Sequence, residues 1–199
     1  MPGIEVATPS GPARIHPAPV DDARAVLLLG HSAGGGVDDR ALQAARTGAA
    51  AAGVSTVLLE MPYRVAGSKR PHGPAEADAA WLAVVAHLRE HVPDLVLVSG
   101  GRSYGGRIAC RTSAAAGAAG VLCLAFPLDP SYGSSRQHEL DAVSAPMLVV
   151  QGERDPFGRP APAPPLREVV LVRGDHSLRT ALPDVTAHVR EWLAGVLGG

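Results

Sequence analysis

The chain has 199 residues, of which 46% are hydrophobic, 19% charged and only 4% aromatic. This composition predicts one globular domain, residues 1–199, with a sizeable core built mainly from Ala, Val and Leu. Gly (23 residues) and Pro (18 residues) make up about a fifth of the chain, below the ~25% that indicates low complexity. Eighteen basic residues against nineteen acidic ones, without a basic run, argue against a nucleic-acid partner.

The sequence carries no sign of a membrane or export segment. No apolar stretch approaches the ~18 residues that a bilayer span needs, and the N-terminus lacks a basic start followed by an apolar run. Cys110 and Cys123 are too few for a disulfide framework. We therefore expect two buried free thiols, a cytoplasmic location and no membrane partner.

Strand and helix patterns alternate along the chain. A possible hairpin within residues 1–20 comes first. Near-continuous apolar runs then predict buried parallel strands at 25–30, 55–60, 94–99, 121–126, 146–151 and 168–172. Helical patterns cover 40–52, 81–88, 104–116 and 185–196, whereas five prolines in 156–165 exclude a helix from most of that link. This order predicts an α/β fold with a mostly parallel, doubly wound sheet and helices on both faces.

In such a fold, ligands bind beyond the carboxyl ends of the strands. Residues 101–105 form a G-x-S-x-G motif there, between a predicted strand and a helix. Small residues on both sides of Ser103 allow the sharp turn that exposes a nucleophilic hydroxyl. The start of the helix adds free N–H groups and the positive end of a dipole, which favour an oxyanion.

A second G-x-S-x-G motif, residues 30–34, competes for the same role. An oxyanion hole takes one N–H from the residue after the nucleophile and one from the loop of an earlier strand. Ser103 has such an earlier loop, and Ser32 has only the uncertain hairpin before it. We therefore predict Ser103 as the nucleophile and Tyr104, Ala33 and Ser32 as oxyanion residues. His31 is expected to be a structural hydrogen-bonding residue.

A serine hydroxyl needs a base, and the base needs an acid to orient it. Asp155 follows the strand at 146–151, and His176 follows the strand at 168–172, in the chain order that this fold uses. Glu153 and Asp129 are alternatives for the acid. The spacing predicts a triad of Ser103, Asp155 and His176.

A metal motif is also present, because residues 87–91 read H-x-x-E-H. The motif lies at the C-terminal end of a helix, away from the carboxyl ends of the strands, and has no obvious third ligand. A histidine is favoured at a helix C-terminus by the dipole alone. We therefore expect no metal site.

These segments carry a family likeness. The chain resembles the small α/β-hydrolases of the dienelactone-hydrolase-like kind, and most closely the testis-expressed and NSL-complex-subunit type of hydrolase-like proteins. The matching pieces are residues 29–35, 99–107, 125–128, 151–155 and 174–176. The resemblance implies an α/β-hydrolase fold with a Ser-Asp-His arrangement on Ser103, Asp155 and His176, and no cofactor. Ser32, where relatives often have Gly, and the proline-rich 156–165 depart from the pattern.

The predicted function is a serine hydrolase that cleaves a carboxylic ester or a related acyl compound through an acyl-enzyme. The alternatives are a non-catalytic binding module on the same fold, or a thioesterase or acyltransferase. The partner is a small-molecule acyl substrate, and the short 127–145 link argues against a large lid. The predicted pocket walls are Tyr63, Arg64, Phe126, Tyr132 and Phe157.

Overall fold

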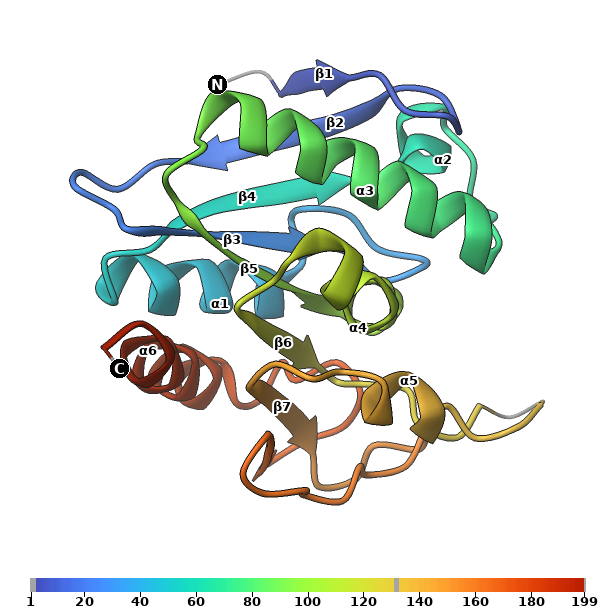
Figure 1. Cartoon of the computed structure of the whole chain (residues 1–199). Helices are drawn as coiled ribbons and strands as arrows, with labels where there is room; N and C mark the ends of the chain where they lie inside the picture. Colours follow the sequence, from blue (N-terminus) through green and yellow to red (C-terminus); the bar gives the residue numbers. More distant parts are fainter. Residues whose placement is uncertain (1–2, 131–132, 199) are drawn as a thin grey trace.

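An eight-stranded sheet forms the centre of the molecule, and its strand order is β1-β2-β4-β3-β5-β6-β7-β8 (Figure 1). The computed structural model describes residues 3–130 and 133–198. The strands are β1 (Ile4–Val6), β2 (Ala13–Ala18), β3 (Ala25–Gly30), β4 (Ser55–Glu60), β5 (Val96–Arg102), β6 (Gly120–Leu124), β7 (Met147–Gly152) and β8 (Arg167–Val172). Strands β3 to β8 pair in parallel, and β1 and β2 form an antiparallel pair at one edge. This is the α/β-hydrolase fold class predicted from the sequence.

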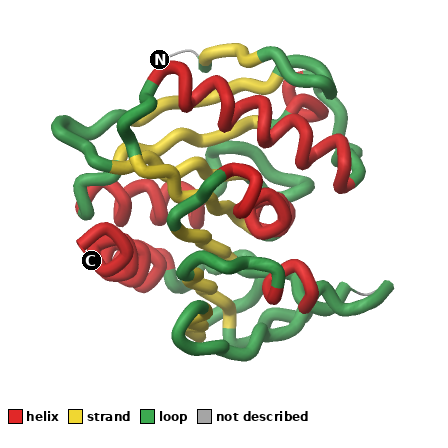
Figure 2. Tube along the Cα trace, viewed as in Figure 1, coloured by secondary structure: helices red, strands yellow, loops and turns green. Residues whose placement is uncertain are grey.

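Helices cover both faces of the sheet (Figures 1 and 2). They are α1 (Arg40–Ala51), α2 (Pro62–Val65), α3 (Pro74–His91), α4 (Tyr104–Ala116), α5 (Gln137–Asp141) and α6 (Leu182–Gly198). Residues of α1 and α6 pack in one core layer, and residues of α3, α4 and α5 pack in the other. Short α2 and α5 were not predicted, because neither is long enough to show a helical period.

Strand β3 explains why the strand sequences are almost continuously apolar. Val26 and Leu28 point into one core layer, and Leu27 and Leu29 point into the other. Successive side chains alternate between the faces of a strand, so a sheet covered on both sides buries all of them.

The link between β7 and β8 contains no α-helix, as its five prolines predicted. Strand β8 lies at the sheet edge, and Leu171 is 51% exposed there. Cys110 and Cys123 are buried free thiols, and their sulfur atoms lie 3.5 Å apart within hydrogen-bond distance. Among the described residues, no helix combines the length and apolar character that crossing a membrane requires.

Candidate active site

The turn between β5 and α4 holds Ser103 in an unusual backbone conformation. Its φ is +51° and its ψ is −105°, and α4 begins at the next residue. A positive φ is strained for a residue with a side chain, so the surrounding packing must impose it. Gly101 and Gly105 allow this packing: a Cβ on either would collide with the carbonyl oxygen of Gly30.

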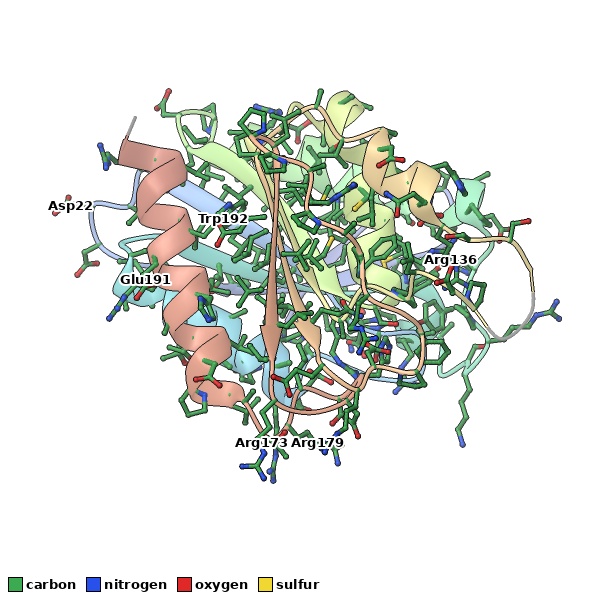
Figure 3. All side chains as sticks on the ribbon, turned by 90° about the horizontal axis from the view of Figure 1, so that it is seen from below. Asp22, Arg136, Arg173, Arg179, Glu191 and Trp192 are labelled. Carbon is green, nitrogen blue, oxygen red and sulfur yellow. The ribbon has the colours of Figure 1, made fainter. Side chains whose placement is uncertain are left out.

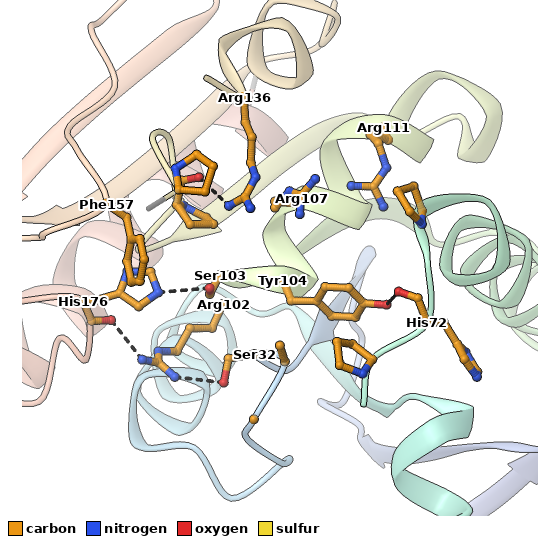
Figure 4. Close-up of a pocket in the computed structure, with 16 residues that line it drawn as sticks. Ser32, His72, Arg102, Ser103, Tyr104, Arg107, Arg111, Arg136, Phe157 and His176 are labelled. Atoms are coloured by element: carbon orange, nitrogen blue, oxygen red, sulfur yellow. Dashed lines mark hydrogen bonds between the residues drawn. The ribbon is translucent and has the colours of Figure 1, made fainter. Parts of the chain in front are cut away.

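Three side chains from three separate loops meet at this turn. The Ser103 Oγ lies 3.0 Å from Nε2 of His176 (Figure 4). Nδ1 of His176 lies 2.8 Å from Oδ2 of Asp155. His176 comes from the loop after β8, and Asp155 comes from the loop after β7. The structure therefore brings together Ser103, His176 and Asp155, the three residues that the sequence predicts as nucleophile, base and acid.

The carboxylate of Asp155 is fully buried and held on both oxygens. Its Oδ1 accepts the backbone N–H of Phe157 at 2.9 Å, and its Oδ2 accepts Nε2 of Gln151 at 2.8 Å. Gln151 is itself buried, and it also bonds the backbone of Phe126 in both directions. These bonds stabilise a buried charge that would otherwise be costly. Glu153 and Asp129, the alternative acids, are exposed, and neither contacts His176.

The loop after β3 faces Ser103 across the pocket, as an oxyanion loop would. Within the described part of the chain, the N–H groups of Tyr104 and Ala33 donate no hydrogen bond. Tyr63 fixes this loop, because its hydroxyl donates to the Ala33 carbonyl at 2.8 Å. Two backbone N–H groups without partners among the described residues, next to Ser103 in the chain and in the loop after β3, suit a developing oxyanion.

His31 is fully buried under the same loop and has a structural arrangement. Its Nδ1 donates to the Ser32 carbonyl at 2.8 Å, and its Nε2 accepts the Met61 N–H at 3.1 Å. Only a neutral ring can make both bonds. Burial lowers the pKa of His31, which favours that neutral form.

Arg102, the residue before Ser103, links the loop after β3 to the loop after β8. Its guanidinium donates to Oδ2 of Asp39 at 2.9 Å, to Oγ of Ser32 at 3.1 Å and to the carbonyl of His176 at 2.9 Å. Asp39 also caps α1 with its other oxygen. One side chain thus connects the candidate oxyanion loop, the start of α1 and the loop of the candidate base.

A cavity of about 540 Å³ opens over Ser103 and His176. The predicted wall residue Phe157 lines it, with its ring centroid 4.6 Å from that of His176. Three other predicted wall residues do not line it. Phe126 is 0% exposed in the core, Tyr63 holds the loop after β3 through its bond to the Ala33 carbonyl, and Arg64 is not part of the lining. Tyr132 lies outside the described residues.

Sequence reasoning missed three arginines that line this cavity. Arg107, Arg111 and Arg136 line it together with Arg102. Arg107 and Arg111 are one helical turn apart on α4, a spacing that could have suggested a shared basic face. Arg136 lies in a loop, where no periodic pattern indicates which way a side chain points.

The histidines of the H-x-x-E-H motif lie far along α3 from this cavity. The donor atoms of His87, Glu90 and His91 lie within 4.8 Å of one another. Within the described residues, no fourth metal-binding side chain joins them, and none of the three lines the cavity. The arrangement gives no reason to place a metal at Ser103.

Comparisons with known proteins identify the same fold class as the sheet topology. Residues 23–189 match the Alpha/beta hydrolase domain family, and the chain belongs to that family. No curated protein sequence matches the chain.

Among solved structures, the chain is similar to a lidless α/β serine hydrolase from Xanthomonas campestris. That comparison has a TM-score of 0.81 and 17% identity, and covers 99% of this chain and 95% of the other. Est1E from Butyrivibrio proteoclasticus has a TM-score of 0.79 and 15% identity, with both chains fully covered. Dienelactone hydrolase from Anabaena variabilis has a TM-score of 0.78 and 17% identity, covering 97% and 96% of the chains. At these identities the likeness establishes the fold alone.

Proposed function

We propose that the protein is a serine hydrolase that cleaves a carboxylic ester or a related acyl compound through Ser103, His176 and Asp155. The observation that carries this proposal is the 3.0 Å approach of Ser103 Oγ to His176 Nε2, at a residue whose φ of +51° places its hydroxyl at the start of a helix. Family membership and structural neighbours named as serine hydrolases and esterases support it.

The chemistry is acyl transfer to water in two steps. Ser103 Oγ attacks the carbonyl carbon while His176 Nε2 takes the hydroxyl proton, and Asp155 stabilises the resulting imidazolium. The N–H groups of Tyr104 and Ala33 hold the oxyanion. The C–O bond to the leaving group then breaks, and the alcohol leaves with the proton from His176.

Water completes the cycle. His176 takes a proton from a water molecule, which attacks the acyl-enzyme and forms a second oxyanion. Collapse releases the carboxylic acid and returns the proton to Ser103. No cofactor takes part in this sequence.

We further propose a cytoplasmic location, from the buried free thiols, and a nearer kinship with the testis-expressed and NSL-complex-subunit type of hydrolase-like proteins. The second point rests on the segments at residues 99–107 and 151–155, which extend beyond the bare serine motif.

A fluorophosphonate probe tests the proposed function, because it labels only an activated serine. We expect labelling of the wild type and of Ser144→Ala, an exposed control serine, and none of Ser103→Ala. Hydrolysis of p-nitrophenyl acetate should follow the same pattern. A folded wild type that is neither labelled nor active on short esters or thioesters would favour a binding module. Labelling that survives Ser103→Ala and is lost in Ser32→Ala would make Ser32 the nucleophile.

A further inference from the structure

The cavity over Ser103 has one strongly basic wall. Arg107 and Arg111 reach it from α4, and Arg136 reaches it from the residue before α5 (Figure 4). Because the backbone N–H of Arg107 bonds the Ser103 carbonyl, this wall begins one helical turn from the candidate nucleophile. A substrate group that projects from the scissile ester into the cavity would meet it.

Two carboxylates compensate part of this charge. Arg107 binds Glu139 through two bonds of 2.9 and 2.6 Å, and Arg111 binds Asp78 at 2.6 Å and Glu139 at 3.2 Å. Burial alone would raise the pKa of Glu139, but the bonds and charges of Arg107 and Arg111 outweigh burial and lower it. Glu139 is therefore ionised at neutral pH, and its ion pairs, with that of Asp78 to Arg111, compensate two of the three guanidiniums.

Arg136 has no ion-pair partner among the described residues. Its side chain donates one hydrogen bond, to the Pro127 carbonyl at 2.9 Å. Burial lowers its pKa, the charge of Arg107 lowers it further, and the charge of Glu139 offsets part of this. A cation is thus held, partly buried, beside two others. Arg102 on the opposite side of the cavity does not share this state, because Asp39 pairs with it.

We propose that Arg136, supported by Arg107, binds an anionic group of the substrate, so that the preferred ester carries a carboxylate or a phosphate on its acyl or alcohol part. The inference rests on the proposed function for the cleavage step. A guanidinium presents a planar pair of N–H donors that matches either anion. An incoming anion would supply an ion-pair partner for Arg136 in a cavity large enough for a small ester.

Binding to the inactive enzyme tests the subsite without turnover. In the Ser103→Ala protein, calorimetry with glutarate and with inorganic phosphate should show binding of at least one, which identifies the preferred anion. Adding Arg136→Gln should weaken that binding about tenfold or more, since hydrogen bonds between charged groups are lost. The matched control is Arg173→Gln, which removes an exposed arginine that points outward beside Arg179, away from Arg136 (Figure 3). Absence of binding of both anions, or equal weakening by both variants, would overturn the subsite.

Kinetics with matched esters provide the second test. Monoethyl adipate against diethyl adipate varies the charge of the acyl part, and 4-acetoxybenzoate against its methyl ester varies the charge of the alcohol part. We expect kcat/KM to favour the anionic ester about tenfold or more in at least one pair, and Arg136→Gln to abolish that ratio mainly through KM. Because the measurement is the ratio of kcat/KM between the anionic and the neutral ester, a variant that is less active on both esters does not change it. A preference for the neutral ester in both pairs contradicts the proposal.

The two proposals can fail separately. Anion binding that depends on Arg136, together with no fluorophosphonate labelling, keeps the subsite and removes the hydrolase function. Labelling at Ser103 without any preference for anions keeps the hydrolase function and removes the subsite.

Discussion

Two G-x-S-x-G turns follow neighbouring strands of this sheet, and they have different structures. After β5, Ser103 has a φ of +51°, the helix starts at the next residue, and the hydroxyl meets His176. After β3, the helix starts only at Arg40, and the Ser32 hydroxyl accepts a bond from Arg102. The same five-letter pattern therefore produces one candidate nucleophile and one supporting residue.

The difference lies in what surrounds the last glycine of each motif. Gly105 is pressed against the backbone of Gly30, and its N–H donates to the His31 carbonyl at 3.1 Å, which joins the two turns. Gly34 has open space where a Cβ would be. The sharp turn at Ser103 thus depends on close packing against a neighbouring strand end and on a helix that starts at the next residue, and the letters of the motif specify neither.

The largest expected difference between the two turns is in catalysis. Ser103→Ala should lower kcat/KM for p-nitrophenyl acetate by roughly 10⁴-fold or more, because the nucleophile is gone. Ser32→Ala should cost less than about tenfold, since it removes one hydrogen bond from a loop. Steady-state hydrolysis by both purified variants measures this, and a greater loss in Ser32→Ala would reverse the roles of the two turns.

The next difference is in stability. Gly105→Ala should lower the free energy of unfolding by about 3 kcal/mol, because the added methyl group collides with backbone that cannot move aside. Gly34→Ala should change it by less than about 0.5 kcal/mol, as expected for an open position. Urea denaturation gives both values. Equal effects would mean that Gly105 is not packed as tightly as the structure indicates.

Much of this contrast was accessible from the sequence. The strands and the long helices followed from apolar runs and helical spacing. The choice of Ser103 over Ser32 followed from the earlier loop that an oxyanion hole needs, which precedes Ser103 and not Ser32. Asp155 and His176 followed from their places after the last two strands. Residues that act through tertiary contacts were not accessible: Gln151 and Arg136 sit in no periodic pattern that shows their partners.

Phe126 illustrates a residue that the sequence predicted for the cavity wall and that the structure places elsewhere. It follows the end of β6, a position that predicts a pocket wall, yet it is completely buried. Its backbone is bonded in both directions by the Gln151 side chain, which holds it within the core. A loop position identifies the edge of the sheet, and only the three-dimensional contacts decide which side chains enter the cavity.

The second position of the motif also differs between the two turns: it is His31 in the first and Arg102 in the second. Arg102 connects the turns, because its guanidinium donates a hydrogen bond to the Ser32 hydroxyl. Arg102→Met should lower kcat by about tenfold or more with little change in KM, because the His176 loop and the Ser32 loop lose a shared donor. Arg102→Lys should keep more activity than Arg102→Met, because the ammonium group can still donate hydrogen bonds. It should have less activity than the wild type, because an ammonium group lacks the planar pair of donors of a guanidinium. If Lys and Met variants have wild-type kcat and differ only in melting temperature, Arg102 has no positioning role.

The smallest expected difference is in how stability depends on pH, and it concerns His31, which occupies in the first turn the position of Arg102 in the second. Burial lowers the pKa of His31 below its ordinary 6.5, so folding favours the neutral ring. The stability that this ring contributes is complete above about pH 6.5 and is lost as the pH falls below that value toward the lowered pKa. Urea midpoints of the wild type should therefore decline from pH 7 to 5.5 more steeply than those of His31→Gln.

Arg102→Met supplies the matched control at the equivalent position of the second turn, because a guanidinium stays charged throughout this range and its removal should leave the slope unchanged. Parallel slopes for the wild type and His31→Gln would show that the buried ring does not resist protonation, and would leave the first turn without the pH sensitivity that separates it from the second.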